Sequence, residues 1–167
     1  MRFETGMLVV HPVYGVCKVE HIGPVDVKLD KSQRSFYKLA PVYDTKSRLF
    51  VPVDGDNYDL RPVMTKQSAE ELVRQIPQME PVLITNEKER EKVFKELLHT
   101  GDHRDTIRVI KTIYKRRQDR MRAGKKNMSM DEKYLGIARE RLNGELAIAL
   151  GIDRSGVDAY ISSILDE

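Results

Sequence analysis

The stretch RDTIRVIKTIYKRRQDRMRAGKK, residues 104–126, decides how the second half of the chain folds. It holds ten basic and two acidic residues, a local charge of 10 − 2 = +8, so the rest of the chain sums to 3 − 8 = −5. In an α-helix, at 100° per residue, five of the cations share an arc of about 60°: Arg104, Arg108, Lys111, Lys115 and Arg122. The opposite side is apolar and holds Ile107, Ile110, Ile113, Tyr114 and Met121. The pattern predicts an amphipathic helix, and we call its five aligned cations the basic face.

The basic face carries an energetic cost. Like charges one turn apart on a helix repel by a few tenths of a kcal/mol, so a solvated structural helix normally mixes signs. The excess of one sign therefore favours contact with a polyanion, and the alternative is a hydrated face that only keeps the chain soluble. Three other cations, Arg116, Arg117 and Arg120, lie off the arc. We expect these to pair with acids of neighbouring helices.

Composition indicates a folded chain of one large or two small domains. The 167 residues are 40% hydrophobic and 33% charged, which is typical of globular proteins. The single cysteine, Cys17, lies in a strand pattern among apolar residues, excludes an internal disulfide and fits a reducing cytoplasm. No apolar run approaches the length of about 18 residues that crosses a bilayer. We expect a cytoplasmic protein without a membrane segment.

Two patterns divide the chain near residue 64. Up to that point, short apolar runs alternate with turn residues and predict strands near residues 7–10, 15–22, 35–39, 48–51 and 60–63. Strands this short bury an apolar face by curling, so we expect a small β-barrel over residues 1–64. Residues 65–167 change to helical periodicity and predict a bundle of about five helices. The expected fold class is α+β, a small barrel followed by an all-helical domain.

Capping residues place the helix starts. Ser68 with Glu71 predicts the first start, Asn86 the second, and Ser129 with Glu132 the fourth. Gly101 and Asp102 end the second helix and begin the basic one.

Catalytic and cofactor motifs do not emerge from the sequence. The chain has no phosphate-binding or dinucleotide-binding glycine loop. His99 and His103 straddle the break at Gly101, so they are not expected to share a metal. Asp54, Asp56 and Asp59 surround Gly55, which favours a turn, although a hard cation and a metal-dependent nuclease remain an alternative. We expect no enzyme activity, no cofactor and no metal.

Four segments in this order carry a family resemblance. They are FETGMLVVHPVYGVCKVEHI (3–22), LFVPVD (49–54), GDHRDTIRVIKTIYKRRQDR (101–120) and ARERLNGELAIALG (138–151). Together they resemble the CarD/CdnL family of bacterial transcription factors over essentially the whole chain. The resemblance implies a Tudor-like domain that binds the RNA polymerase β subunit, like the related module of transcription-repair coupling factors. It also implies a helical domain that contacts promoter DNA at the upstream edge of the bubble and stabilises the open complex without reading sequence.

The resemblance also directs the choice of site residues. The polymerase-binding edge is expected at Lys46, Ser47, Arg48, Leu49, Phe50 and Val51, and Phe50 stands where a basic residue can occur. DNA contacts are expected from the basic face together with Lys88 and Arg90, although the acids of that helix, Glu87, Glu89, Glu91 and Glu96, allow ordinary helix pairing.

One departure from the family pattern concerns the wedge that opens the DNA. Many members carry a tryptophan there, but Glu87 occupies the position here and the chain has no tryptophan.

A different class of function remains open. Small barrels and basic helices also occur in RNA-binding or ribosome-associated modules. We expect a monomer, because no sequence feature indicates self-association.

Overall fold

The computed structural model describes residues 2–26, 28–29, 31–55 and 60–165. The chain divides into two compact units, Met1–Val63 and Met64–Glu167. We call them the sheet unit and the helical unit.

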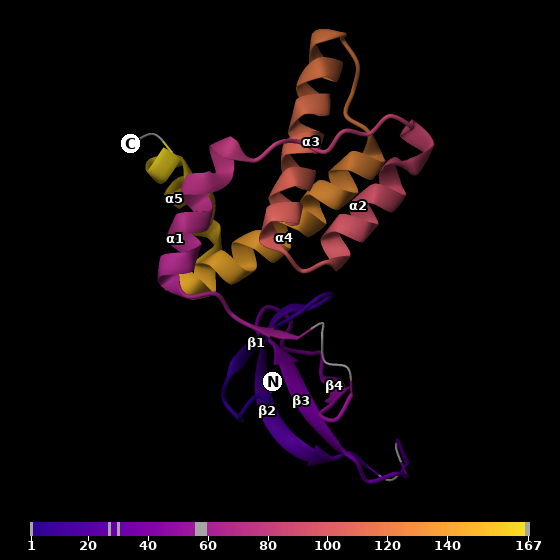
Figure 1. Ribbon diagram of the computed structural model, residues 1–167, viewed down its shortest axis with the longest axis vertical. Helices are drawn as coiled ribbons and strands as arrows, with labels where there is room; N and C mark the ends of the chain where they lie inside the picture. The colour runs from indigo at the N-terminus through magenta and orange to yellow at the C-terminus, as the bar shows by residue number, and fades with distance from the viewer. Residues whose placement is uncertain (1, 27, 30, 56–59, 166–167) are drawn as a thin grey trace. The chain divides into compact units, whose positions relative to one another are not determined.

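The sheet unit is an antiparallel five-stranded sheet (Figure 1). Its strands are β1 (Leu8–His11), β2 (Gly15–Pro24), β3 (Ser35–Pro41), β4 (Leu49–Pro52) and β5 (Arg61–Pro62), in the order β4-β3-β2-β1-β5. The predicted α+β fold, a small β unit followed by helices, is confirmed; over the described residues the sheet is not closed into a full barrel. Both edge strands are short and end at a proline, which lacks the N–H that a further ladder bond would need.

One face of the sheet carries the apolar core of this unit. Alternation along the strands brings together Phe3, Val9, Cys17, Val19, Tyr37, Leu39 and Leu60. The Tyr37 hydroxyl accepts a hydrogen bond from the backbone N–H of Phe3 at 3.1 Å. Burial raises the pKa of the Cys17 thiol to about 11. Cys17 is therefore a neutral, buried apolar residue, as its strand pattern predicted.

The helical unit contains five α-helices and three short 3₁₀ turns within the described residues. The helices are α1 (Lys66–Gln75), α2 (Arg90–His99), α3 (His103–Arg122), α4 (Ser129–Leu150) and α5 (Val157–Leu165). The turns are η1 (Ile76–Gln78), η2 (Glu87–Glu89) and η3 (Arg154–Gly156). The basic stretch forms α3, as predicted.

The caps agree with the sequence at two helix starts and differ at two. The Asp102 carboxylate accepts the Arg104 N–H at 2.8 Å and begins α3. Asn86 caps η2, which leads into α2. The cap of α1 is Thr65, which accepts the Ser68 N–H at 3.1 Å, so Ser68 already lies inside the helix. No side chain caps α4, which begins at Ser129 itself.

Two apolar clusters hold the helices together, and α3 and α4 contribute to both. The first cluster joins α1, α3, α4 and α5, with Val73, Ile107, Leu146 and Val157 among its members. The second joins α2, α3 and α4 through Phe94, Leu98, Val109, Ile113, Leu135 and Ala138. Ile110 packs against both clusters. The central α3–α4 pair therefore determines where every other helix lies.

A buried ion pair links α2 to α4 beside the second cluster. Arg90 donates from Nε to Asp131 Oδ1 at 3.0 Å and from Nη2 to Oδ2 at 3.2 Å. Both residues are only 4% exposed. The guanidinium also lies 4.9 Å from the centre of the Phe94 ring. This two-point bond fixes α2 against the first turn of α4.

Asp131→Ala should lower the free energy of unfolding of the helical unit by about 3–5 kcal/mol, because Arg90 would keep a buried charge without its partner. Urea unfolding followed by helical circular dichroism measures the change. Glu132→Ala is the matched control, because it removes the next acid in the same helical turn, whose partner Arg117 is partly exposed. The control should cost about 1 kcal/mol or less, and equal losses in the two variants would contradict the assignment.

Candidate docking edge and nucleic-acid interface

The residues predicted to bind polymerase form one turn and one edge strand. Lys46 and Ser47 belong to a turn closed by Asp44, which accepts hydrogen bonds from the Ser47 hydroxyl and the Lys46 N–H. These bonds, the Ser47 hydroxyl first, hold the pKa of Asp44 below its usual value. Leu49, Phe50 and Val51 follow in β4, which pairs with β3 and with no other described strand. Three of the six predicted residues therefore lie in this open edge strand, and Lys46, Ser47 and Arg48 form the turn that leads into it.

Arg48 connects the start of β4 to the sheet. Its Nε lies 2.7 Å from Glu20 Oε1, and its guanidinium donates to the carbonyl oxygens of Thr45 and Ser47. Two hydrogen bonds of the Arg48 guanidinium thus order the turn itself. Its position at the edge is fixed before any partner arrives.

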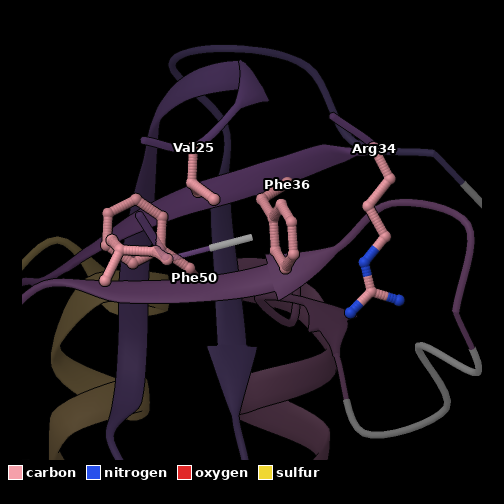
Figure 2. Close-up of a pocket in the computed structure, with 5 residues that line it drawn as sticks. Val25, Arg34, Phe36 and Phe50 are labelled. Carbon is pink, nitrogen blue, oxygen red and sulfur yellow. The ribbon is translucent and has the colours of Figure 1, made fainter. Parts of the chain in front are cut away.

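A pocket lined by apolar side chains and by Arg34 lies beside this edge, on the sheet face opposite the core (Figure 2). It has a volume of about 530 Å³ and is lined by Val25, Leu29, Arg34, Phe36 and Phe50. Phe50 alternates with Leu49 and Val51, which pack toward the core, so its ring points outward and is 43% exposed. The pocket was not predicted from the sequence, because its wall comes from the β2–β3 connection, far from β4 along the chain.

The basic face of α3 consists of two groups: three cations near the start of the helix and two near its end. Arg104 donates to Gln75 Oε1 at 2.6 Å, Arg108 to the Glu80 carbonyl at 3.2 Å and Lys111 to the Met79 carbonyl at 2.8 Å. These three partners are neutral and hold the side chains along the 75–80 segment, and Arg108 also lies 3.9 Å from the carboxylate of Asp105. Lys115 and Arg122 lie further along α3, are exposed, and make no ion pair with the described residues.

The two exposed cations continue into the connection after α3. Lys125 and Lys126 follow Gly124 and are also exposed. We call Lys115, Arg122, Lys125 and Lys126 the distal cationic surface. The last two were part of the charge count but not of the predicted site, because a helical projection places no residue beyond the helix end. The only sequence signal for them was the continuation of the basic run.

The off-arc arginines are largely occupied inside the helical unit. Arg116 contacts Glu87 and lies 3.7 Å from Asp131, and Arg117 pairs with Glu132. The expectation of pairing is thereby confirmed for these two. Arg120 instead donates to the Lys126 carbonyl at 2.7 Å.

The predicted DNA contacts at the start of α2 need one correction. Arg90 is buried in its pair with Asp131 and does not reach solvent, so it is withdrawn from the candidate DNA surface. The acids near Arg90 in the sequence predicted ordinary pairing within its own helix. Its partner is instead Asp131, which lies 41 residues away in the chain. Lys88 is exposed on η2. Glu87, at the position of the family tryptophan, is paired with Arg116.

A buried carboxylate fixes the beginning of the helical unit. Glu145 of α4 is 1% exposed, and its Oε2 accepts the backbone N–H of Met64 at 2.8 Å. Its other oxygen contacts Nε2 of His103 at the start of α3. His103 therefore belongs to this network, while His99 lies at the end of α2 and takes no part in it.

The remaining sequence candidates are placed as follows. Asp54 pairs with Arg2 at 3.6 Å, while Asp56 and Asp59 lie outside the described residues. Over the described ranges, no group of three or more His, Cys, Asp or Glu side chains is arranged to hold a metal. No helix among them is both long enough and apolar enough to cross a membrane.

Comparison with protein families gives two matches that lie end to end. The family model of the CarD-like/TRCF RID domain matches residues 3–64, and that of the CarD C-terminal domain matches residues 71–162. Together they cover the sheet unit and nearly all of the helical unit. The second match alone spans more than half of the chain. The open sheet with its exposed edge and the bundle built on a basic helix are the two parts of one family architecture, and the chain belongs to the CarD family of RNA polymerase-interacting transcription factors.

Proposed function

We propose that this protein binds the β subunit of RNA polymerase through β4 and contacts promoter DNA through the distal cationic surface. As a cytoplasmic monomer, it stabilises the open complex and makes no covalent change. The observation that carries the proposal is the open edge at β4, which holds three of the six predicted polymerase-binding residues, with the other three in the turn before it. Membership of the CarD family supports an interaction with polymerase.

The chemistry of an edge strand supports the first contact. An extended segment of a partner can add to β4 through backbone hydrogen bonds, which demand little of its sequence. Selectivity must then come from side chains. Phe50 projects from β4 into the adjoining pocket, and Lys38 lies directly opposite Phe50 in the β3–β4 register. An added strand can bury a large apolar side chain in this pocket.

The charge distribution supports the second contact. The four residues of the distal cationic surface are exposed, and cations of this kind bind phosphates without reading bases. The other three cations of the basic face are held along the 75–80 segment, and one of them, Arg108, also faces Asp105. These three add a long-range attraction for DNA while Lys115 and Arg122 make the contact.

The regulatory effect follows from a difference in affinity. A protein that binds the open and closed complexes equally well shifts no equilibrium, however tightly it binds. Contacts with DNA that only the melted promoter presents to a polymerase-bound protein supply such a difference. The proposed arrangement therefore needs both interfaces in the same chain.

Phe50→Ala should weaken binding to bacterial RNA polymerase core enzyme by at least about tenfold, because a buried aromatic anchor typically contributes 2 kcal/mol or more to an interface. Biolayer interferometry with the full-length chain immobilised measures the affinity. Tyr43→Ala is the matched control, since Tyr43 is 41% exposed in the same unit but does not line the pocket. Its affinity should stay within about twofold of the unmodified chain. Equal losses, or none, would contradict a docking role for the β4 edge.

The double variant Lys115→Ala/Arg122→Ala should reduce the salt dependence of duplex binding. Two lost phosphate contacts lower the slope of log K against log salt by about 1.8, at about 0.9 per contact. Fluorescence anisotropy with a duplex oligonucleotide, repeated across a salt series, measures the slope. Lys18→Ala/Lys66→Ala removes the same charge from two other exposed lysines and should leave it nearly unchanged.

The same double variant should shorten the lifetime of the open complex in a competitor-challenge assay with polymerase and promoter DNA. The control pair should not shorten it. A lifetime equal to that of the unmodified protein would remove the distal cationic surface from the mechanism.

A further inference from the structure

A groove of about 470 Å³ opens in the helical unit between α3, α4 and α5. Its floor is apolar and consists of Ile76, Ile107, Ile110, Leu142 and Ile161. Ile107 and Leu142 are buried members of the first apolar cluster, whereas Ile110 and Ile161 are only partly covered. The groove thus exposes an apolar surface at a place where the helices are otherwise fully packed.

The wall formed by α4 and α5 is polar, and its two charged side chains neutralise each other. Arg139 pairs with Asp158, and Asn143 donates from Nδ2 to the other oxygen of the same carboxylate at 3.0 Å. Ser162 completes this rim. Because both oxygens of Asp158 are engaged by donors, this acid presents little negative charge to an anion entering the groove.

The wall formed by α3 combines an aromatic ring with positive charge. Tyr114 lines the groove and is 36% exposed. Lys111 also lines it, and its ammonium bonds to a neutral carbonyl, so its charge persists. Lys115 follows Lys111 by one turn on the same side of the helix and is exposed. Arg117 lies 5.5 Å from the centre of the Tyr114 ring, but its charge is paired with Glu132, so Lys111 and Lys115 are the cations that this wall offers.

An apolar slot with an aromatic edge and a row of cations has the chemistry of sites for unpaired nucleotides. Such sites stack a base on an aromatic ring and hold the backbone with Lys or Arg, and they tolerate any base because every base has a flat face. In a duplex both faces of each base are stacked and its pairing edge is occupied. The groove is therefore suited to a strand that has been separated from its partner.

We propose that this groove binds an unpaired base of melted promoter DNA. The base enters over Ile110 and Ile161 and stacks against Tyr114, while Lys111 and Lys115 contact the flanking phosphates. The inference rests on the proposed function and names the part of the open complex that the helical unit holds. It also offers a contact to melted DNA in a chain where Glu87, paired with Arg116, occupies the position of the family tryptophan.

A free nucleotide also offers a base and a phosphate, so it could occupy the same groove as a DNA strand. The cations distinguish the two sources, because Lys115 extends the positive charge along α3 beyond the groove, where a second phosphate of a continuous strand would lie. We therefore assign the site to single-stranded DNA.

Two adjacent serines on α5 provide the test. Ser162→Trp places a large side chain in the mouth of the groove, whereas Ser163→Trp adds the same group at a neighbouring exposed position that does not line it. The probe is an oligothymidylate with one 2-aminopurine, whose fluorescence reports stacking and binding, and a duplex of matched length is measured in parallel. Circular dichroism confirms that each variant is folded.

Ser162→Trp and, separately, Tyr114→Leu should weaken binding of the single strand by about tenfold, which corresponds to about 1.4 kcal/mol. Neither should change duplex affinity by more than about twofold, and Ser163→Trp should leave both affinities unchanged.

If both groove variants bind the single strand as the unmodified chain does while duplex binding persists, the groove assignment is overturned and the proposed function stands. If the unmodified chain binds neither form of DNA, both fail. Saturable binding of adenosine monophosphate that the oligonucleotide does not displace would also overturn the assignment to DNA.

Discussion

The packing of α3 between two apolar clusters is the constraint on which the rest of the helical unit depends. Ile107 faces one cluster, Val109 and Ile113 face the other, and Ile110 packs against both. Burying three or four such side chains contributes several kcal/mol, which leaves the helix no freedom to rotate. The cations at the remaining positions are thereby held at the surface. Their mutual repulsion, which would destabilise an isolated helix, is offset by the free energy of burying the apolar side chains.

The small sheet unit combines an apolar core on one face with an exposed edge and an exposed second face. Its core lies on one face, so the β4 edge and the opposite face are free to carry Phe50 and the pocket beside it. An exposed edge is ordinarily an aggregation hazard. Here β4 has only four residues, ends at Pro52 and follows directly after Arg48, which is paired with Glu20. These features limit promiscuous pairing while leaving room for one short partner strand.

Sequence periodicity predicted the elements well because each is determined locally. The wheel of residues 104–126 identified α3 and its apolar side, and short apolar runs located the strands. Contacts between residues far apart in the sequence could not be predicted in this way. Nothing near Arg90 indicated that Asp131 would bury it, and nothing on α3 indicated that the 75–80 segment would cross Arg104, Arg108 and Lys111. The pocket and the groove likewise combine side chains from distant segments. The small β unit was predicted, but its open form was not: over the described residues the two edge strands are short, end in proline and do not pair with each other.

The buried carboxylate of Glu145 has a consequence for how the two units work as a pair. Strand β5 ends at Pro62, and the N–H of Met64 is already held by Glu145, so Val63 is the only residue between the two anchored ends. A tether this short keeps a second binding module at an effective concentration on the order of millimolar once the first has engaged. Under the proposed function, weak contacts with DNA then suffice, because binding to polymerase has already brought the helical unit close to the promoter.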